Sequence, residues 1–393
     1  MEIVCFSHLR WDFVFQRPQH LLTRFADHFR IFYIEEALFH SDQDHYSEVL
    51  HGNIHIVKLH LKGGHEEPDV VSRQKKLVSA IFNKHKINEY LLWYYTPMAL
   101  PFSDHLEPVI TVYDCMDELS AFKFAPPALK QLEKDLLNKA DVVFTGGHSL
   151  YEAKKHRHHN IHAFPSSIDK KHFAAARNVK HDPADQAQIP HPRFGFYGVL
   201  DERFDVELIR EVADARPDWH FVLIGPVVKI DPATLPKNEN IHYLGAKKYA
   251  ELPTYLGGWD ISMVSFALNE STTFISPTKT PEYLAGGKPV ISTPIRDVVE
   301  SYGKAGLIHI ASNAREFISL AEKELAVKDR KKWLHQVDKY LANCSWDNTV
   351  HDMRQLMYKA IAKKEAVAER RKKEEVFTAA PFLMVKPQLP AAS

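Results

Sequence analysis

Residues 276–292 read SPTKTPEYLAGGKPVIS, and they are the most informative stretch of the chain. Ser276 is a typical helix cap, and Pro277 suits the first position of a helix. The glycine pair at 286 and 287 can end that helix, and Pro289 then leads into an apolar run that reads as a buried strand. The stretch therefore predicts a short helix followed by a strand, which is the repeating unit of a parallel sheet.

The expected helix carries a cation and a carboxylate on one face. Lys279 lies near its start and Glu282 follows three residues later, so both side chains project from the same side. A helix amino terminus can bind phosphate, and a Lys beside a Glu would suit a diphosphate and the hydroxyls of an attached ribose. The residues alone fit equally well with a surface helix whose Lys–Glu pair stabilises it by about 0.2–0.5 kcal/mol.

Strands and helices alternate on both sides of this stretch, which predicts α/β domains with parallel sheets wrapped by helices. The expected strands are 3–7, 31–35, 54–59, 90–95, 109–113, 142–145 and 161–164, then 194–197, 221–225, 241–244, 261–266, 289–292 and 307–310. The expected helices are 16–29, 70–84, 128–139 and 149–156, then 205–214, 249–256, 278–286 and 313–326.

We expect two Rossmann-like βαβ domains joined by a polar, proline-bearing segment. Ligands of open α/β sheets bind at the carboxyl ends of the strands, so the two parallel sheets should face each other across a binding cleft. The expected boundaries are 1–170 for the N-terminal domain, 171–192 for the linker, 193–345 for the C-terminal domain, 346–375 for a helix crossing back to the first domain, and 376–393 for a disordered tail.

Composition argues against several classes of protein. The 393 residues contain 50 Lys plus Arg and 50 Asp plus Glu, so no net field would gather a nucleic acid. The three cysteines are too scattered for a metal, redox or disulfide framework, and a reducing cytoplasm fits them. Residues 1–7 read as a first strand and not as a signal peptide, and the apolar stretch 90–102 is too short to span a bilayer.

The spacing within residues 277–291 resembles the donor-binding signature of glycosyltransferases with the GT-B fold. In that signature, Pro-x-Lys-x-x-Glu-x-x-Ala-x-Gly-x-Pro-Val-[Val/Ile] opens the helix beneath the nucleotide. By this resemblance Glu282 binds the ribose hydroxyls and Lys279 faces the diphosphate. The helix start, with Ser276 and Thr278, would face the diphosphate as well.

Further segments are similar to one branch of family-4-like glycosyltransferases, the branch of teichuronic acid and exopolysaccharide biosynthesis. The resemblance implies GT-B architecture with an acceptor domain followed by a donor domain. It also implies transfer of a hexose-type sugar from a nucleotide-diphosphate sugar, with UDP favoured, to a glycan or lipid-linked acceptor in cell-surface polysaccharide biosynthesis. The similar segments are 7–20, 113–118, 164–169, 195–198 and 223–226.

One position departs from the resemblance. Many retaining members carry a Glu eight residues before the ribose Glu, close to the transferred sugar, and here that position is Phe274. The nearest carboxylate is Glu270. A retaining outcome is favoured by the resemblance, and inversion stays open.

The loop after the first strand supplies candidates for the acceptor side of the cleft. Arginine offers a bidentate fork for phosphate or carboxylate, and tryptophan a face on which a sugar can stack. The alternative is that Trp11 packs in the core and the arginines are solvated. The candidates are His8, Arg10, Trp11, Asp12 and Arg17.

Asp114 and Asp117 follow the strand expected at 109–113, where a general base for an acceptor hydroxyl would stand. We expect Asp117 to be the catalytic carboxylate, with Asp114 at the cleft or capping the turn. Turn formation by both residues is the structural alternative.

Arg203 and Lys229 follow neighbouring strands of the second half and would converge on the cleft. Together with Lys279 they could neutralise a leaving diphosphate. No Asp-x-Asp triplet stands at the end of an expected strand, so we expect neither a metal nor another cofactor. In the GT-B fold, backbone atoms of the loop at 246–249 commonly hold the base of the nucleotide.

Two surface segments are open to a second interpretation. The helix expected at 70–84 has an apolar side and several cations, so it can pack on the sheet or rest on an anionic membrane. The second possibility would place a cytoplasmic protein at the inner face of the membrane. His156, His158 and His159 crowd among cations and read as a solvated helix end.

Three other functions compete with glycosyl transfer. A nucleotide-sugar epimerase of the same fold should turn over its donor without an acceptor, and a non-catalytic nucleotide-sugar-binding protein should bind without turnover. An NAD-dependent oxidoreductase would need a G-x-G-x-x-G motif after the first strand, and residues 6–10 contain no glycine.

Overall fold

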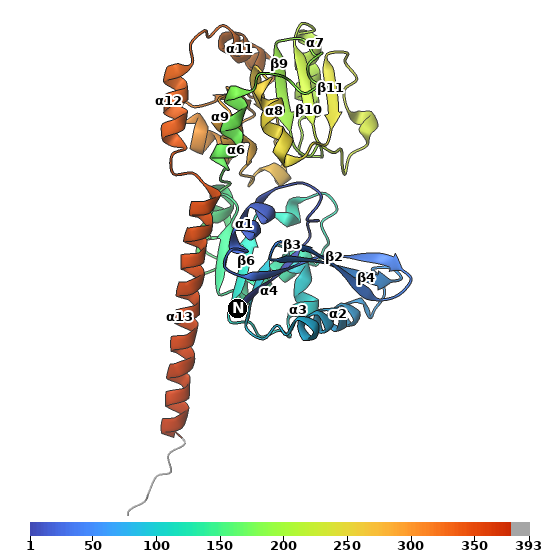
Figure 1. Cartoon of the computed structure of the whole chain (residues 1–393), viewed down its shortest axis with the longest axis vertical. Helices are drawn as coiled ribbons and strands as arrows, with labels where there is room; N and C mark the ends of the chain where they lie inside the picture. The colour runs from blue at the N-terminus through green and yellow to red at the C-terminus, as the bar shows by residue number, and fades with distance from the viewer. Residues whose placement is uncertain (379–393) are drawn as a thin grey trace, which may run out of the picture.

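The computed structural model describes residues 1–378, with side chains described up to residue 371. The chain forms two α/β domains stacked end to end, with a long helix running down beside the first domain and past it (Figure 1). Most of the tail expected at 376–393 lies outside the described residues. The final helix, α13 (Trp346–Thr378), runs three residues beyond the end expected for it.

The first domain is built on an eight-stranded sheet in the order β3-β4-β2-β1-β5-β6-β7-β8. The strands are β1 (Glu2–Ser7), β2 (Arg30–Ser41), β3 (His45–His51), β4 (Ile54–Lys62), β5 (Tyr90–Tyr94), β6 (Thr111–Cys115), β7 (Val142–Thr145) and β8 (Ile161–Ala163). Its helices are α1 (Arg17–Phe25), α2 (Val70–His85), α3 (Leu100–Ser103), α4 (Leu129–Lys139) and α5 (His148–Lys154).

Alternate residues of each central strand face opposite layers of helices. Val4 and Phe6 of β1 belong to the core shared with α2, α3, α4 and α5, while Ile3 and Cys5 belong to the core shared with α1 and α13. Burial on both faces explains why these strands read as continuous apolar runs.

The sheet departs from the expected pattern at one edge. β3 pairs antiparallel with β4, with His51 opposite Ile54, whereas only parallel strands were expected. β3 was not predicted because both of its faces are largely exposed at the edge of the sheet, so its sequence is polar and lacks the apolar pattern of a buried strand. The pair Gly52-Asn53 joins the two strands, and Gly52 has a φ of 58° that suits a tight hairpin turn.

The second domain is an all-parallel sheet in the order β11-β10-β9-β12-β13-β14. The strands are β9 (Arg193–Tyr197), β10 (His220–Ile224), β11 (Ile241–Gly245), β12 (Ile261–Val264), β13 (Val290–Ser292) and β14 (His309–Ile310). Its helices are α6 (Lys170–Ala174), α7 (Val206–Ala215), α8 (Leu252–Gly257), α9 (Lys279–Ala285), α10 (Arg296–Val298), α11 (Ala314–Leu325) and α12 (Lys331–Tyr340).

The segment 171–192, expected to be a linker, is folded onto the second domain. It completes α6, and Phe173, Ala176 and Ile189 are buried in the core of the second sheet. Gln186 accepts a hydrogen bond from the indole of Trp259 at 2.9 Å. The prolines and charged residues of segment 171–192 suggested a linker, because its buried apolar residues are few. Those few contacts with the core hold the segment against the second domain.

The chain crosses between the domains twice, and the second crossing returns it to the first domain. Trp346, Met353 and Met357 of α13 are buried with Leu21 and Phe25 of α1 in one hydrophobic core. Figure 1 shows α13 passing beside α1. The first domain is therefore completed by the last described helix of the chain.

Among the described residues, no helix combines the length and the apolar character needed to span a bilayer.

Candidate functional site

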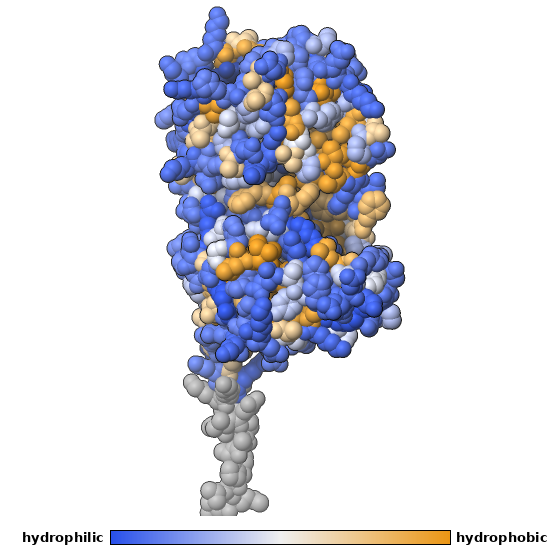
Figure 2. Space-filling view, turned by 45° about the vertical axis from the view of Figure 1, so that its right-hand side comes forward, coloured by the Kyte–Doolittle hydropathy of each residue, from blue (hydrophilic) through white to orange (hydrophobic). Residues whose placement is uncertain are grey.

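A cavity of about 550 Å³ lies between the two domains. Figure 2 shows the molecule hollowed between them, with apolar side chains gathered at the hollow. The lining comes from loops at the carboxyl ends of β1, β6, β9 and β10, and from the start of α9. Of the sequence candidates, those that line the cavity are Trp11, Asp12, Arg17, Asp117, Arg203, Ser276, Thr278, Lys279 and Glu282.

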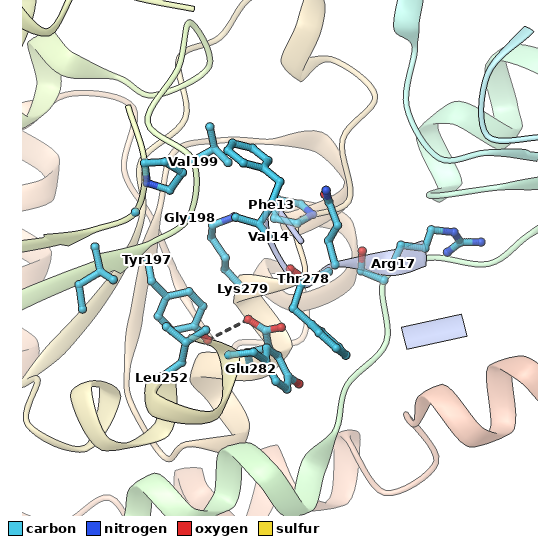
Figure 3. Close-up of a pocket in the computed structure, with 18 of the residues that line it drawn as sticks. Phe13, Val14, Arg17, Tyr197, Gly198, Val199, Leu252, Thr278, Lys279 and Glu282 are labelled. Atoms are coloured by element: carbon cyan, nitrogen blue, oxygen red, sulfur yellow. Dashed lines mark hydrogen bonds between the residues drawn. The ribbon is translucent and has the colours of Figure 1, made fainter. Parts of the chain in front are cut away.

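Glu282 is fixed on the second-domain wall of the cavity by two tyrosines. The Tyr197 hydroxyl donates to Glu282 Oε2 at 2.8 Å, and the Tyr197 backbone N–H donates to the Tyr283 hydroxyl at 3.1 Å. Figure 3 shows the first of these bonds beneath Lys279. Burial raises the pKa of Glu282, and the Tyr197 hydrogen bond opposes that rise. The carboxylate is thus held with one oxygen occupied by Tyr197 at the end of β9.

Lys279 lies one turn before Glu282 and passes over Gly198. A Cβ at Gly198 would stand 2.3 Å from Lys279 Cε, so a larger residue at this position would displace the end of the lysine side chain. Gly198 also has a φ of 144°, which other residues rarely adopt. Burial lowers the pKa of Lys279, the nearby Arg203 lowers it further, and Glu282 opposes this. An anionic ligand would therefore stabilise the charged ammonium.

Helix α9 begins later than expected, because Ser276 and Pro277 precede it and Thr278 is its N-cap. Thr278 makes no side-chain capping hydrogen bond. The proline of the first helical turn is Pro281, where a missing N–H leaves no helical hydrogen bond unmade. The Ser276 carbonyl instead accepts a hydrogen bond from Ser166 of the first domain at 2.5 Å, so Ser276 connects the two walls.

Two cations of the second domain flank Phe122 of the first domain. The Arg203 guanidinium lies 5.3 Å and the Lys229 ammonium 5.0 Å from the centre of the Phe122 ring. Arg203 also forms a forked ion pair with Asp201, with contacts of 2.6–3.1 Å. Sequence reasoning missed Asp201, although it stands only two residues before Arg203. Lys229 does not line the cavity.

Asp117 lies on the opposite wall, half-buried beyond the end of β6. Burial raises the pKa of Asp117 to about 6, while the charges of Arg203, Arg17 and Lys229 pull it back down. A carboxylate with a pKa near the working pH is suited to accept a proton. Asp117 faces cations from both domains, so it stands at the meeting point of the two walls.

Asp114 and Arg17 form a buried ion pair, so Arg17 lines the cavity with its charge already engaged. Arg17 Nε lies 3.1 and 3.0 Å from the two oxygens of Asp114, and a second nitrogen lies 2.9 Å from one of them. A third donates to the Phe164 carbonyl at 2.7 Å. Figure 3 shows the Arg17 side chain directed away from Lys279 and Glu282. Asp114 is fully buried, so it neither caps the turn nor lines the cavity.

Arg10 and Trp11 are held by Glu35, a buried carboxylate that the sequence did not single out. Arg10 lies 3.2 Å from Glu35 and does not line the cavity. The Trp11 backbone N–H donates to Glu35 at 2.8 Å, and its ring packs edge-on against Tyr33 at 5.0 Å. Trp11 is 8% exposed, so core packing is the better description of its indole.

His8 and Asp12 take different positions. The Nδ1 of His8 is buried without a hydrogen-bond partner among the described residues. Burial, together with the charge of Lys229, lowers the pKa of His8 to about 4, so its imidazole is neutral at neutral pH. Asp12 lines the cavity from its exposed rim and lies 3.7 Å from Lys58.

The loop at 246–249 lines the cavity as well, and its last residue joins the domains. The Tyr249 ring stacks on Phe15 of the first domain at 4.4 Å and on His172 at 4.4 Å. The His172 ring also contacts the Tyr249 carbonyl at 3.0 Å. This loop is therefore braced from both sides.

The position where many retaining relatives place a Glu is occupied by an apolar contact. Phe274 packs against the core of the first domain. Glu270 is exposed and does not line the cavity. The carboxylates that line the cavity are Asp12, Asp117 and Glu282.

The expectation of no Asp-x-Asp triplet at a strand end was wrong. β2 continues to Ser41, so Asp42-Gln43-Asp44 directly follows it. None of the triplet lines the cavity. Asp44 accepts from the Lys62 backbone at 2.8 Å and lies 3.2 Å from Arg73.

The cations of α2 are largely paired. Lys75 lies 2.8 Å from Asp104 and Arg73 lies 2.7 Å from Glu67. Val78 and Ile81 are buried against the sheet. These contacts are those of an ordinary packed helix.

Two Rossmann-like domains whose strand ends face a shared cavity define the GT-B architecture, as the resemblance implied. Residues 191–326 match the family model described as Glycosyl transferases group 1. The match to a group 1 glycosyltransferase domain is therefore confined to residues 191–326, which contain the strands of the second sheet from β9 to β14.

A curated protein that resembles this chain is also named as a glycosyltransferase. TuaH of Bacillus subtilis (strain 168), named as a teichuronic acid biosynthesis glycosyltransferase, is 23% identical over 247 residues. That match covers 54% of this chain and 61% of TuaH, so it spans less than two thirds of that curated relative.

Solved structures confirm the fold over nearly the whole chain. The sucrose-phosphate synthase of Thermosynechococcus elongatus superposes with a TM-score of 0.69 at 15% identity, covering 92% of this chain and 99% of that one. Anabaena Alr3699/HepE in complex with UDP gives 0.62 at 14% identity, covering 91% and 100%.

Proposed function

We propose that this protein transfers a hexose-type sugar from a UDP-sugar to a glycan or lipid-linked acceptor in cell-surface polysaccharide biosynthesis. The observation that carries the proposal is the convergence of Lys279, Glu282 and Arg203 on one wall of the cavity, with Asp117 on the other. The names of two similar proteins support it, because TuaH is named for teichuronic acid biosynthesis and HepE binds UDP.

The donor would bind to the second domain. Glu282 has one oxygen engaged by Tyr197, which leaves lone pairs for the hydroxyls of a ribose. Lys279 and Arg203 would meet the diphosphate, and Lys229, which lies beside Phe122 outside the cavity lining, would add positive charge nearby. Their positive charges would stabilise the charge that develops on the leaving nucleotide, so transfer would proceed without a metal ion.

The acceptor would enter from the first domain and present a hydroxyl to Asp117. In an inverting reaction, Asp117 would take the proton as the new glycosidic bond forms and the bond to the diphosphate breaks. In a retaining reaction, the departing phosphate would take that proton and Asp117 would orient the acceptor. The retaining course is favoured, and Phe274 leaves the sugar without the carboxylate contact found in many retaining members.

Calorimetric titration with UDP and a coupled assay for UDP release test this function together. The protein should bind UDP, and Glu282→Ala should bind about 10- to 150-fold more weakly, the equivalent of hydrogen bonds to a charged group. Glu270→Ala, which changes an exposed carboxylate outside the cavity, is the matched control. Equal UDP binding by wild type and Glu282→Ala would refute the donor site.

The same assay separates the competing functions. Donor turnover that needs no acceptor would indicate an epimerase or hydrolase. Binding with no turnover across a panel of glycan and lipid-linked acceptors would indicate a nucleotide-sugar-binding protein. Acceptor-dependent UDP release supports the transferase.

A further inference from the structure

Three side chains with metal-binding chemistry meet in the first domain, away from the cavity. Glu48 of β3, His55 of β4 and His85 of α2 each present a ligand atom, and these atoms all lie within 4.8 Å of one another. None of the three lines the cavity between the domains. The trio has no part in the proposed transfer reaction, and the fold alone brings it together.

The hairpin and the end of α2 explain the convergence. Leu50 stands opposite His55 in the antiparallel pair, so Glu48, two residues earlier, projects on the same face as His55. His85 is the last residue of α2. The ring of Phe32 lies against both imidazoles, at 4.5 Å from His55 and 4.9 Å from His85.

The carboxylate of Glu48 sits between the two imidazoles. One oxygen contacts Nδ1 of His55, and the other lies 3.0 Å from Nε2 of His85. The three side chains are 13–17% exposed. They are sheltered from most of the solvent, yet an ion can still reach them.

We propose that Glu48, His55 and His85 form a binding site for a divalent transition metal, with Zn²⁺ as the ion that suits them best. Two imidazole nitrogens and one carboxylate are a ligand set typical of zinc and its neighbours. Metal–ligand bonds of about 2.0–2.1 Å in a tetrahedron separate the ligand atoms by about 3.4 Å. Because these atoms already lie within 4.8 Å, side-chain shifts of roughly 1 Å would close the site.

Such an ion would act as a cross-link in the first domain. β3 is the edge strand of the sheet, and β4 is its one ladder partner within residues 1–378. A metal shared by Glu48, His55 and His85 would tie this edge strand to the carboxyl end of α2. The fourth coordination position would be left for water.

Lys84 competes with a metal for the same carboxylate. Its ammonium lies 3.0 Å from Glu48, on the oxygen that His85 also contacts. This pair is exposed on the lysine side, so its contribution is small and a dication can displace it. Removing the ammonium should therefore strengthen metal binding.

Titration of the full-length, chelator-stripped protein with Zn²⁺ alone tests the proposal. Calorimetry should show one tight site, and Zn²⁺ should raise the thermal midpoint. Co²⁺ should give the visible absorption of a low-coordinate nitrogen and oxygen site. His55→Gln and His85→Gln should each weaken Zn²⁺ binding by more than about 100-fold. Loss of a residue that only supports a metal ligand typically costs about 10- to 100-fold, and these residues are proposed to bind the metal directly. Lys84→Gln should tighten binding by up to about fivefold.

A second histidine pair on the same hairpin provides the matched control. His45 and His60 stack at 4.3 Å, and His60 contacts the Ser47 hydroxyl. The double change His45→Gln/His60→Gln should leave the tight site intact. The proposal fails if the wild type shows no tight site, or if His55→Gln retains it. If a histidine variant does not fold, metal binding by Lys84→Gln and the Co²⁺ spectrum of the wild type test the site instead. UDP binding by the wild type is measured separately, so a protein that binds UDP but no metal contradicts the metal site and leaves the transferase proposal standing.

Discussion

The carboxylate of Asp297 in the second domain caps helix α5 of the first domain at Ser149. Asp297 accepts hydrogen bonds from the backbone N–H groups of His148 and Ser149, both at 2.9 Å, and from the Ser149 hydroxyl. A capping side chain normally comes from the residue just before the helix, and here that residue is Gly147. A Cβ at Gly147 would stand 2.4 Å from the Asp297 carboxylate, so a glycine at this position leaves room for the capping contact.

Asp297→Ala should lower the free energy of unfolding by about 1–3 kcal/mol, because buried N–H groups lose their acceptor. It should also loosen the domain arrangement, which small-angle scattering would detect as a larger radius of gyration. Asn313→Ala is the control, because Asn313 caps α11 within one domain through the Glu316 N–H at 3.0 Å. Identical scattering from the two variants would show that Asp297 does not hold the domains together.

If Asp117 takes the acceptor proton, Asp117→Asn should lower kcat by about 10²- to 10⁴-fold while UDP affinity stays nearly constant. If Asp117 only orients the acceptor, as in the retaining course, the loss of kcat should be smaller. The pKa of Asp117 is raised to about 6, and Asp117 must be ionised to act as a base. Activity should therefore be present above pH 6 and fall as the pH drops through that value. A variant that retains full turnover, or that loses UDP binding and turnover together, would move the role of base to Asp12 or His8.

Asp114→Asn should lower the stability of the protein more than Asp117→Asn does, although the two aspartates are only three residues apart. The change leaves the Arg17 guanidinium buried without its counter-charge, which typically costs about 3–5 kcal/mol. Chemical denaturation of Asp114→Asn and Asp117→Asn side by side measures this. If Asp117→Asn is the less stable of the two proteins, Asp117 is the structural residue and the roles given to Asp114 and Asp117 are wrong.

Turnover should survive EDTA, since Lys279, Arg203 and Lys229 are expected to balance the charge on the leaving diphosphate. Running the assay on His55→Gln as well removes any effect of chelation at the Glu48, His55 and His85 site. Loss of activity in both proteins, restored by Mg²⁺ or Mn²⁺, would establish a catalytic metal in place of the cations.

Proton uptake on UDP binding offers a check on the state of Lys279. Burial lowers the pKa of its ammonium in the free site, and a bound diphosphate would raise it again. UDP affinity should therefore weaken as the pH rises above neutral, and calorimetry in buffers of different ionisation enthalpy should show protons taken up. Lys279→Arg, which stays charged, should lose both effects.

Most parallel strands were predictable because their residues are buried on both faces, as with the continuous apolar run of β5 at Tyr90–Tyr94. β3 was not, since an edge strand with two exposed faces carries no such signal. The spacing of Lys279 and Glu282 predicted that both project from one face of a helix, and the resemblance to the GT-B signature assigned them to the donor site. The pairing of Asp114 with Arg17 could not, because 97 residues separate them and only the fold brings them together.

Sequence reasoning was least informative about which polar residues are already engaged. Arg10 and Arg17 looked equally free, and each is tied to a buried carboxylate from a distant strand. Asp201 carried a signal that could have been used, because an Asp two residues before an Arg in a loop is placed to pair with it.

The return of α13 to the first domain bears on how the protein is made. Met357 shares a core with Ile3, so the first domain lacks part of its interior until α13 has been synthesised. At about 5–20 residues per second, the ribosome needs roughly 10–40 seconds to travel from the first crossing to that helix. The second domain, whose core ends at Leu341, can complete its fold in that interval. The first domain is therefore synthesised before the second domain but completes its fold after it.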